Sequence, residues 1–183
     1  MTGPAELLSP ERVRCGEPLA SKKRALERAA ELLSPAVPGM TRVEIFDALF
    51  TRERLGSTGL GHGMALPHGR VAGVDAPVAA CLTLANPIDY DAPDRQRVDV
   101  LFVLLVPRDC SDEHLRILSS LAEMFNDESL RDSLRSQTDP EALIQCLADW
   151  SPSADAARTA GSFAGLTSNA FSHAGGTRVS NSA

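Results

Sequence analysis

The run VDVLFVLLVP at residues 98–107 constrains the fold of this chain more than any other feature. It is almost continuously apolar and rich in β-branched residues, which is typical of a strand whose two faces are both covered. Such a strand needs packing partners on each side of its sheet. We therefore expect an α/β or α+β fold in which helices flank a central β-sheet on both faces, as a three-layer sandwich.

Helices are predicted before and after this strand. Residues 21–34 carry apolar side chains at helical spacing, although the segment opens with three cations, Lys22–Arg24, which the helix dipole disfavours. Surface exposure is the only explanation that the sequence offers for them. A capping box at Thr41–Glu44 starts a second helix, which ends near residues 52–56. Three more helices are predicted over residues 111–126, 128–136 and 139–150.

Two more strands are predicted before residue 98. Residues 77–86 form a second apolar run. Met64, Leu66 and His68 alternate in a way that is consistent with a short strand ending at the histidine.

The composition changes at Ser151. The last 33 residues hold eight Ala, seven Ser and four Gly, and they show no apolar periodicity. Such a stretch cannot bury enough surface to offset its ordering entropy. We expect one folded domain over residues 1–150 and a disordered Ala/Ser/Gly-rich tail over residues 151–183.

Charge and hydropathy argue against several classes of protein. The net charge is −6 and no basic run exceeds Lys22–Arg24, so we expect no binding to nucleic acid. No apolar run approaches the ~20 residues of a membrane span, and the first eleven residues lack the pattern of a signal peptide. The four cysteines are far apart and form no C-x-x-C pair, which favours reduced thiols. We expect a cytoplasmic protein that does not insert into a membrane.

The segment LGSTGLGHGMALPHGR at residues 55–70 holds five glycines and two histidines. It has no lysine, so it is not a Walker phosphate loop. It is not a dinucleotide fingerprint either, because Met64 and Leu66 stand where the third glycine of each possible match belongs. What remains is a loop that folds tightly beside a histidine.

His68 lies between Pro67 and Gly69. The proline extends the residue before it and the glycine removes side-chain bulk, so the imidazole is presented in a defined direction. Exposed amides of the glycine-rich loop can form an anion-binding nest. The segment therefore suits a histidine that accepts a phosphoryl group, although an incidental histidine in a turn remains an alternative. The candidate phosphate-binding loop residues are Gly59, Gly61, Gly63 and Gly69.

His114 is a second candidate. Ser111 is a good N-cap, which places His114 in the first turn of its helix, on the face that packs inward. The amides at a helix start, here at Ser111, attract an anion and favour a neutral imidazole. The alternative is a histidine that belongs to the core.

The segments RERLGSTGLGHGMALPHGR and SDEHLRILSSLA together resemble one family. The chain is similar, over about residues 5–150, to the IIA component of the bacterial phosphoenolpyruvate:sugar phosphotransferase system. Within it, the resemblance is to the mannitol/fructose class and best to the nitrogen-regulatory branch. It implies a single mixed β-sheet flanked by helices. We expect no cofactor.

The resemblance also implies roles for three residues. His68 would accept a phosphoryl group from the phosphohistidine of a small HPr-like carrier protein, while the second active-site histidine falls on His114 and the arginine on Arg52. His62 stands where the family usually has asparagine, which could alter the hydrogen bonding of the loop. Without the resemblance, Arg52 would be interpreted as a solvated cation at a helix C-terminus. Arg54 and Arg70 are weaker candidates.

Three functions follow as hypotheses. The first is a phosphoryl carrier that regulates partner proteins, as yet unidentified, according to its phosphorylation state. The second is a sugar-specific IIA component that passes the group to a membrane permease for fructose or mannitol. The third, more remote, is a metal-dependent hydrolase that uses His62, His68 and His114 as zinc ligands. We expect no metal, because the segment offers no convergent carboxylate or cysteine pair.

Overall fold

The computed structural model describes residues 3–109 and 112–151. Three short 3-10 turns are η1 (Pro4–Leu7), η2 (Pro10–Arg12) and η3 (Ser34–Ala36). The strands are β1 (Val13–Glu17), β2 (Gly59–Gly61), β3 (Met64–Ala65), β4 (His68–Val71), β5 (Val78–Ile88) and β6 (Val98–Pro107). The helices are α1 (Lys22–Leu33), α2 (Arg42–Leu55), α3 (Asp112–Asn126), α4 (Glu128–Ser136) and α5 (Pro140–Asp149).

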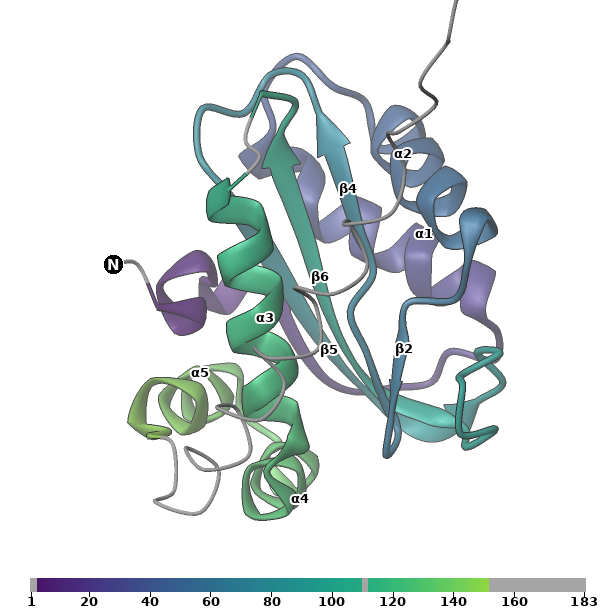
Figure 1. Cartoon of the computed structure of the whole chain (residues 1–183), viewed down its shortest axis with the longest axis vertical. Helices are drawn as coiled ribbons and strands as arrows, with labels where there is room; N and C mark the ends of the chain where they lie inside the picture. The colour runs from purple at the N-terminus through teal and green to yellow at the C-terminus, as the bar shows by residue number, and fades with distance from the viewer. Residues whose placement is uncertain (1–2, 110–111, 152–183) are drawn as a thin grey trace, which may run out of the picture. The chain divides into compact units, whose positions relative to one another are not determined.

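The strands form one mixed sheet in the order β1-β5-β6-β3-β2, with β4 also paired to β6. β5 runs antiparallel to β6, whereas β3 and β4 run parallel to it. Helices α1 and α2 lie on one face of the sheet, and α3 crosses the other (Figure 1). The predicted mixed sheet with helices on both faces is confirmed.

Strand β6 explains the long apolar run. Its side chains alternate between two clusters of buried residues, one on each face of the sheet. Leu101, Val103 and Leu105 pack with α1 and α2. Phe102, Leu104 and Val106 pack with α3, α4 and α5. Both faces of β6 are covered over residues 100–106, and every side chain in that stretch is apolar.

The predicted helices are confirmed, and so is the capping box predicted at Thr41–Glu44. Ser21 caps α1 by accepting a hydrogen bond from the Arg24 backbone N–H. Both hydrogen bonds of the Thr41–Glu44 capping box are present at the start of α2. Asp139 caps α5, and Pro140 is its first residue. Each cap satisfies an amide that the first turn of a helix otherwise leaves unpaired.

The prediction of a strand that ends at His68 is wrong. β3 already ends at Ala65, and His68 begins β4 instead of ending a strand. Residues 64–71 nevertheless keep one register along β6. The ladder is interrupted at Pro67, which has no N–H to donate, although its carbonyl accepts a hydrogen bond from the Leu104 N–H at 2.9 Å.

The sequence did not reveal β1 or β2. β2 and β3 form a hairpin whose two-residue turn is His62–Gly63, with φ values of 55° and 79°. Positive φ at both positions is what the tightest hairpin turns require, and asparagine followed by glycine is their preferred sequence. The residue at 62 therefore shapes the hairpin. Its N–H donates to Asp94 and its carbonyl accepts from Arg135.

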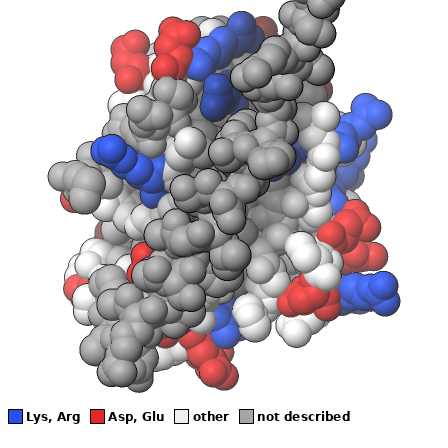
Figure 2. All heavy atoms as spheres, in the orientation of Figure 1, with Lys and Arg blue, Asp and Glu red and all other residues white. Residues whose placement is uncertain are grey.

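Two further observations concern the surface. On the face drawn in Figure 2, basic and acidic side chains alternate around the visible margin. Within residues 3–109 and 112–151, no helix combines the length and apolar character that crossing a bilayer requires. The tail predicted for residues 151–183 lies outside the described residues, apart from Ser151.

Replacing His62 by asparagine should stabilise the protein, because asparagine adopts the left-handed region more readily than histidine. We expect His62→Asn to raise the free energy of unfolding by about 0.5 kcal/mol. His62→Val should lower it, since a β-branched residue is strained at positive φ. Urea unfolding of both variants measures the effect, and a less stable His62→Asn protein would contradict the assignment of this turn.

Candidate functional site

His68 is the first residue of β4. It pairs with Leu104 of β6, whose side chain packs on the α3 side of the sheet, so the imidazole emerges on that side. Its Nδ1 lies 2.9 Å from the Leu66 carbonyl oxygen. Because a carbonyl only accepts hydrogen bonds, the ring carries its proton on Nδ1. Nε2 is left with its lone pair, which is the form of imidazole that acts as a nucleophile.

His114 lies opposite, in the first turn of α3. It is 5% exposed, and its ring centroid is 5.4 Å from that of His68, with the two planes tilted by 52°. Its Nδ1 is buried and has no hydrogen-bond partner within the described residues. A buried polar atom without a partner is costly, so this atom suits a ligand that supplies one.

Both imidazoles favour the neutral form. Burial lowers the pKa of His68, and the nearby Arg52 and Arg70 lower it further, against the Leu66 carbonyl and Glu53, which raise it. Burial also lowers the pKa of His114, followed by the charges of His68, Arg70 and Arg52. Both rings are therefore uncharged near neutral pH, where His68 retains its nucleophilic lone pair.

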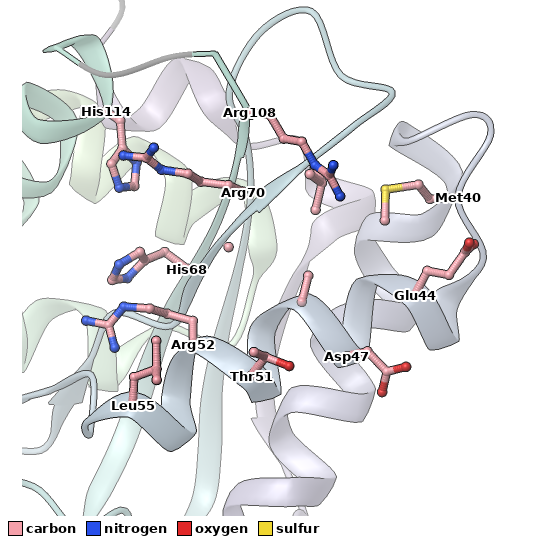
Figure 3. A pocket seen from close by; sticks show the side chains of 13 residues that line it. Met40, Glu44, Asp47, Thr51, Arg52, Leu55, His68, Arg70, Arg108 and His114 are labelled. Atoms are coloured by element: carbon pink, nitrogen blue, oxygen red, sulfur yellow. The ribbon is translucent and has the colours of Figure 1, made fainter.

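The two histidines share an open cavity of about 680 Å³, called here the His68 cavity. It is lined by Met40, Glu44, Asp47, Ala48, Thr51, Arg52, Leu55, His68, Gly69, Arg70, Val71, Arg108 and His114. Both imidazoles and the guanidinium groups of Arg52 and Arg70 lie on the same side of it, whereas Glu44 and Asp47 lie opposite (Figure 3).

Three elements supply the arginines of this cavity. Arg52 belongs to the last turn of α2, and its guanidinium donates to the Gly56 carbonyl at 3.0 Å. Arg70 is two residues after His68 on β4 and so faces the same side of the sheet. Arg108 follows the end of β6. A neutral nucleophile beside the cations of Arg52 and Arg70 can accept an oxyanion such as a phosphoryl group and stabilise its charge.

The structure brings together four of the residues singled out from the sequence: His68, His114, Arg52 and Gly69 all line the His68 cavity. Arg70 lines it too, although the sequence marked it as weaker, and Arg54 does not. Sequence reasoning missed Arg108. The only available signal was its place just after an apolar strand that leads into the helix of His114.

The other three glycines predicted to bind phosphate do not line this cavity, so the structure does not support that part of the prediction. Gly59, Gly61 and Gly63 belong to the β2–β3 hairpin. Gly63 precedes His68 by five residues of a nearly extended chain, which spans roughly 16 Å. These glycines have structural roles: a Cβ at Gly63 would lie 2.5 Å from Nη2 of Arg135. Ser111, the other predicted phosphate-binding residue, lies outside the described residues.

The zinc site considered for His62, His68 and His114 does not assemble. His62 lines a different cavity, of about 380 Å³, together with Arg97, Asp99 and Arg135 among others. The described part of the chain contains no group of three or more His, Cys, Asp or Glu side chains placed to hold a metal ion. The metal-dependent hydrolase therefore lacks its proposed ligand set.

The lowered pKa values predict how stability depends on pH. Both folded-state values lie below the ordinary histidine value of 6.5, so the unfolded chain binds more protons than the folded protein as the pH falls through that region. The free energy of unfolding should therefore decrease between about pH 7 and pH 5. His68→Gln and His114→Gln should each reduce this slope in urea unfolding. Imidazole titrations by NMR with midpoints above 6.5 would contradict the prediction.

Comparison with known proteins identifies relatives over the described domain. Residues 6–150 match the family model for the phosphoenolpyruvate-dependent sugar phosphotransferase system, EIIA 2. A nitrogen regulatory protein of Pseudomonas aeruginosa is 44% identical over 144 residues, which cover 79% of this chain and 94% of that protein. The fructose-specific EIIA component of a phosphotransferase system from Haloferax volcanii is 34% identical over 146 residues, covering 80% of this chain and 92% of that protein.

A solved structure agrees with these matches. The crystal structure of the nitrogen regulatory protein IIA-Ntr from Neisseria meningitidis superposes with a TM-score of 0.75 at 40% sequence identity. The match covers 78% of this chain and 97% of that chain. The likeness therefore extends through nearly the whole of that domain.

Proposed function

Since the chain belongs to the EIIA 2 family of the phosphoenolpyruvate-dependent sugar phosphotransferase system, we propose that it is a phosphoryl carrier of the nitrogen-related branch, with His68 as the acceptor. The donor in this proposal is the phosphohistidine of an HPr-like carrier protein. One observation supports it most directly. His68 holds its proton on Nδ1 and presents Nε2 in a cavity with His114 and three arginines.

In the proposed transfer, bonds to phosphorus form and break only at the imidazole of the donor and at the imidazole of His68. The lone pair on Nε2 of His68 attacks phosphorus in line, and the phosphorus–nitrogen bond of the donor breaks, which returns the lone pair to the donor ring. The proton of His68 stays on Nδ1, which donates its hydrogen bond to the Leu66 carbonyl, and this hydrogen bond stabilises the positive charge that the ring acquires. Arg52 and Arg70, whose guanidinium groups lie beside the two imidazoles (Figure 3), balance the charge on the phosphoryl oxygens.

His114 contributes in this proposal as a neutral, buried neighbour. Its ring lies 5.4 Å from His68, so it can hold a phosphoryl oxygen or orient the acceptor ring. A neutral second imidazole also avoids repulsion with the positive charge that develops on His68. Its place in the first turn of α3 adds the positive end of the helix dipole to the anion site.

Phosphorylation would also change the surface that a partner protein meets. A phosphoryl group adds about −1.5 to −2 charges to a cavity lined by three arginines. Leu55 of the cavity is 82% exposed, and Leu115, which follows His114 in α3, is 61% exposed. Exposed apolar side chains near a site whose charge switches suit regulation through protein binding. The targets in this proposal are regulatory proteins of unspecified identity.

The proposal also covers location and domain organisation. Cys15, Cys81 and Cys146 are free thiols, which fits the reducing conditions of the cytoplasm. We place the carrier function in residues 1–150, since the family match ends at residue 150.

Phosphorylation itself can be measured by mass spectrometry of the intact protein. Incubation with phosphoenolpyruvate, enzyme I of the system and the HPr-like carrier should add about 80 Da in an acid-labile form. His68→Ala should abolish this gain, because it removes the nucleophile. Arg52→Ala should slow it about 100-fold by removing charge stabilisation. Arg54→Ala is the matched control, since this arginine does not line the cavity, and a gain that persists in His68→Ala would move the site elsewhere.

A sugar-specific carrier is the second candidate, and the similarity to the fructose-specific EIIA component of Haloferax volcanii favours it. The same His68 chemistry would then pass the group to a membrane permease. If the regulatory proposal is right, the phosphorylated protein should transfer no measurable phosphate to fructose or mannitol when permease-containing membranes are added. Transfer to either sugar, abolished by His68→Ala, would favour the sugar-specific function.

A further inference from the structure

Glu53 is a buried acid that the proposed function does not use. It follows Arg52 in α2, but its side chain is only 3% exposed and does not line the His68 cavity. The carboxylate accepts hydrogen bonds from the Thr58 backbone N–H, at 3.1 Å to Oε2, and from the Thr58 hydroxyl. Burying a carboxylate is costly, so an acid kept at this position needs an explanation.

Hydrogen bonds continue from Thr58 to the acceptor histidine. The Thr58 carbonyl accepts from the Leu66 N–H at 2.9 Å. The Leu66 carbonyl in turn accepts from Nδ1 of His68 at 2.9 Å. Glu53, Thr58, Leu66 and His68 therefore form a continuous series of contacts, called here the positioning chain.

Leu66 is the link that most needs external support. It lies between β3 and β4, next to the proline that interrupts the ladder with β6. Its N–H is held by Thr58 and not by β6. The direction of the Leu66 carbonyl, and with it the hydrogen bond to His68, therefore depends on how firmly Thr58 is held. Glu53 supplies that restraint through two hydrogen bonds to one residue.

We propose that Glu53 is a positioning residue for the phosphoryl acceptor, acting through Thr58 and Leu66 to keep the proton of His68 on Nδ1 and the lone pair on Nε2. This inference rests on the proposed function for the role of His68, but the tautomer that it predicts does not. The hydrogen bond made at one ring nitrogen sets which nitrogen carries the proton. If the Leu66 carbonyl turns away, the hydrogen bond to Nδ1 of His68 is lost. Part of the population then carries the proton on Nε2, the attacking nitrogen.

The surroundings of Glu53 explain how its charge is tolerated. Lys22 Nζ lies 3.2 Å from Oε1 of Glu53 and 2.7 Å from Oδ2 of Asp91. The same ammonium sits over the Tyr90 ring, 4.7 Å from its centroid, and the Tyr90 hydroxyl lies 3.5 Å from Glu53. The carboxylate is thus paired on one side, which leaves Oε2 for Thr58.

Two variants test the positioning chain. Glu53→Gln weakens the first link, and Thr58→Val removes the hydroxyl while the backbone N–H of residue 58 remains. Nitrogen-15 chemical shifts of the His68 ring, recorded above its pKa, report the tautomer. We expect a pure Nδ1–H form in the unmodified protein and a measurable Nε2–H fraction in both variants.

Transfer kinetics supply the second measurement. The single-turnover rate of phosphorylation by the phosphorylated HPr-like carrier should fall about ten-fold or more in both variants, because a misdirected nucleophile reacts slowly. The carrier concentration at half-maximal rate should stay unchanged, since neither residue lies on the surface of the His68 cavity. Thr58→Ser, which keeps the hydroxyl, should restore the rate.

Two controls separate positioning from stability. Tyr90→Phe removes a hydroxyl that lies 3.5 Å from Glu53 and also contacts the Thr58 side chain, but every hydrogen bond of the positioning chain itself remains, so rate and tautomer should not change. Leu147→Ala creates a cavity at a buried side chain of α5, on the face of the sheet opposite α2, and is chosen to match the loss of stability. It should unfold at lower temperature yet transfer normally at 25 °C.

The outcomes of these measurements distinguish a failure of the positioning role of Glu53 from a failure of the proposed carrier function. If Glu53→Gln and Thr58→Val retain the Nδ1–H tautomer and the full rate, the positioning role is overturned. If Leu147→Ala slows transfer as much as they do, their effect is one of stability and the role is likewise overturned. If the unmodified protein takes up no phosphoryl group, the proposed function fails, and the tautomer measurement still decides the inference.

Discussion

Parallel pairing of residues 64–71 with β6 is the constraint on which the site depends. Because one register holds along the whole segment, His68 and Arg70 emerge on the same side of the sheet as Leu104 and Val106. The same pairing brings the end of β4 beside the end of β6, from which the chain continues into α3. A shift of one residue would turn both basic side chains to the α2 side of the sheet. The register therefore decides whether a site exists.

The site combines groups that electrostatics alone would keep apart. Three arginines line the His68 cavity, and the charges of two of them, Arg52 and Arg70, help to keep the two imidazoles neutral. Near them lies the buried carboxylate of Glu53, which is paired with Lys22. This pairing also explains part of the basic start of α1, for which the sequence offered only exposure. A cation unfavourable to the dipole of its own helix is tolerated because it neutralises a carboxylate from another element.

The fold was largely predictable because its signals are local. The capping box at Thr41–Glu44 and the apolar periodicity located the helices, and the apolar run of β6 required cover on both faces. β1 escaped detection because it is short, polar and interrupted by a register shift. The glycine-rich loop was assigned to phosphate binding as one unit. Its composition does not say that the hairpin turn lies at one end of the extended segment and His68 near the other.

The sequence by itself determined the kind of layers and the helix boundaries, and it singled out His68 as a candidate, because each rests on neighbouring residues or on a distinctive motif. Only the tertiary structure decided which distant side chains meet. Arg70 and Arg108 line the site, whereas three glycines and His62 do not, since strand register sets which residues become neighbours. The hydrogen-bond series from Glu53 to His68 likewise joins α2, the loop after it and the gap between β3 and β4. Packing alone brings those segments together.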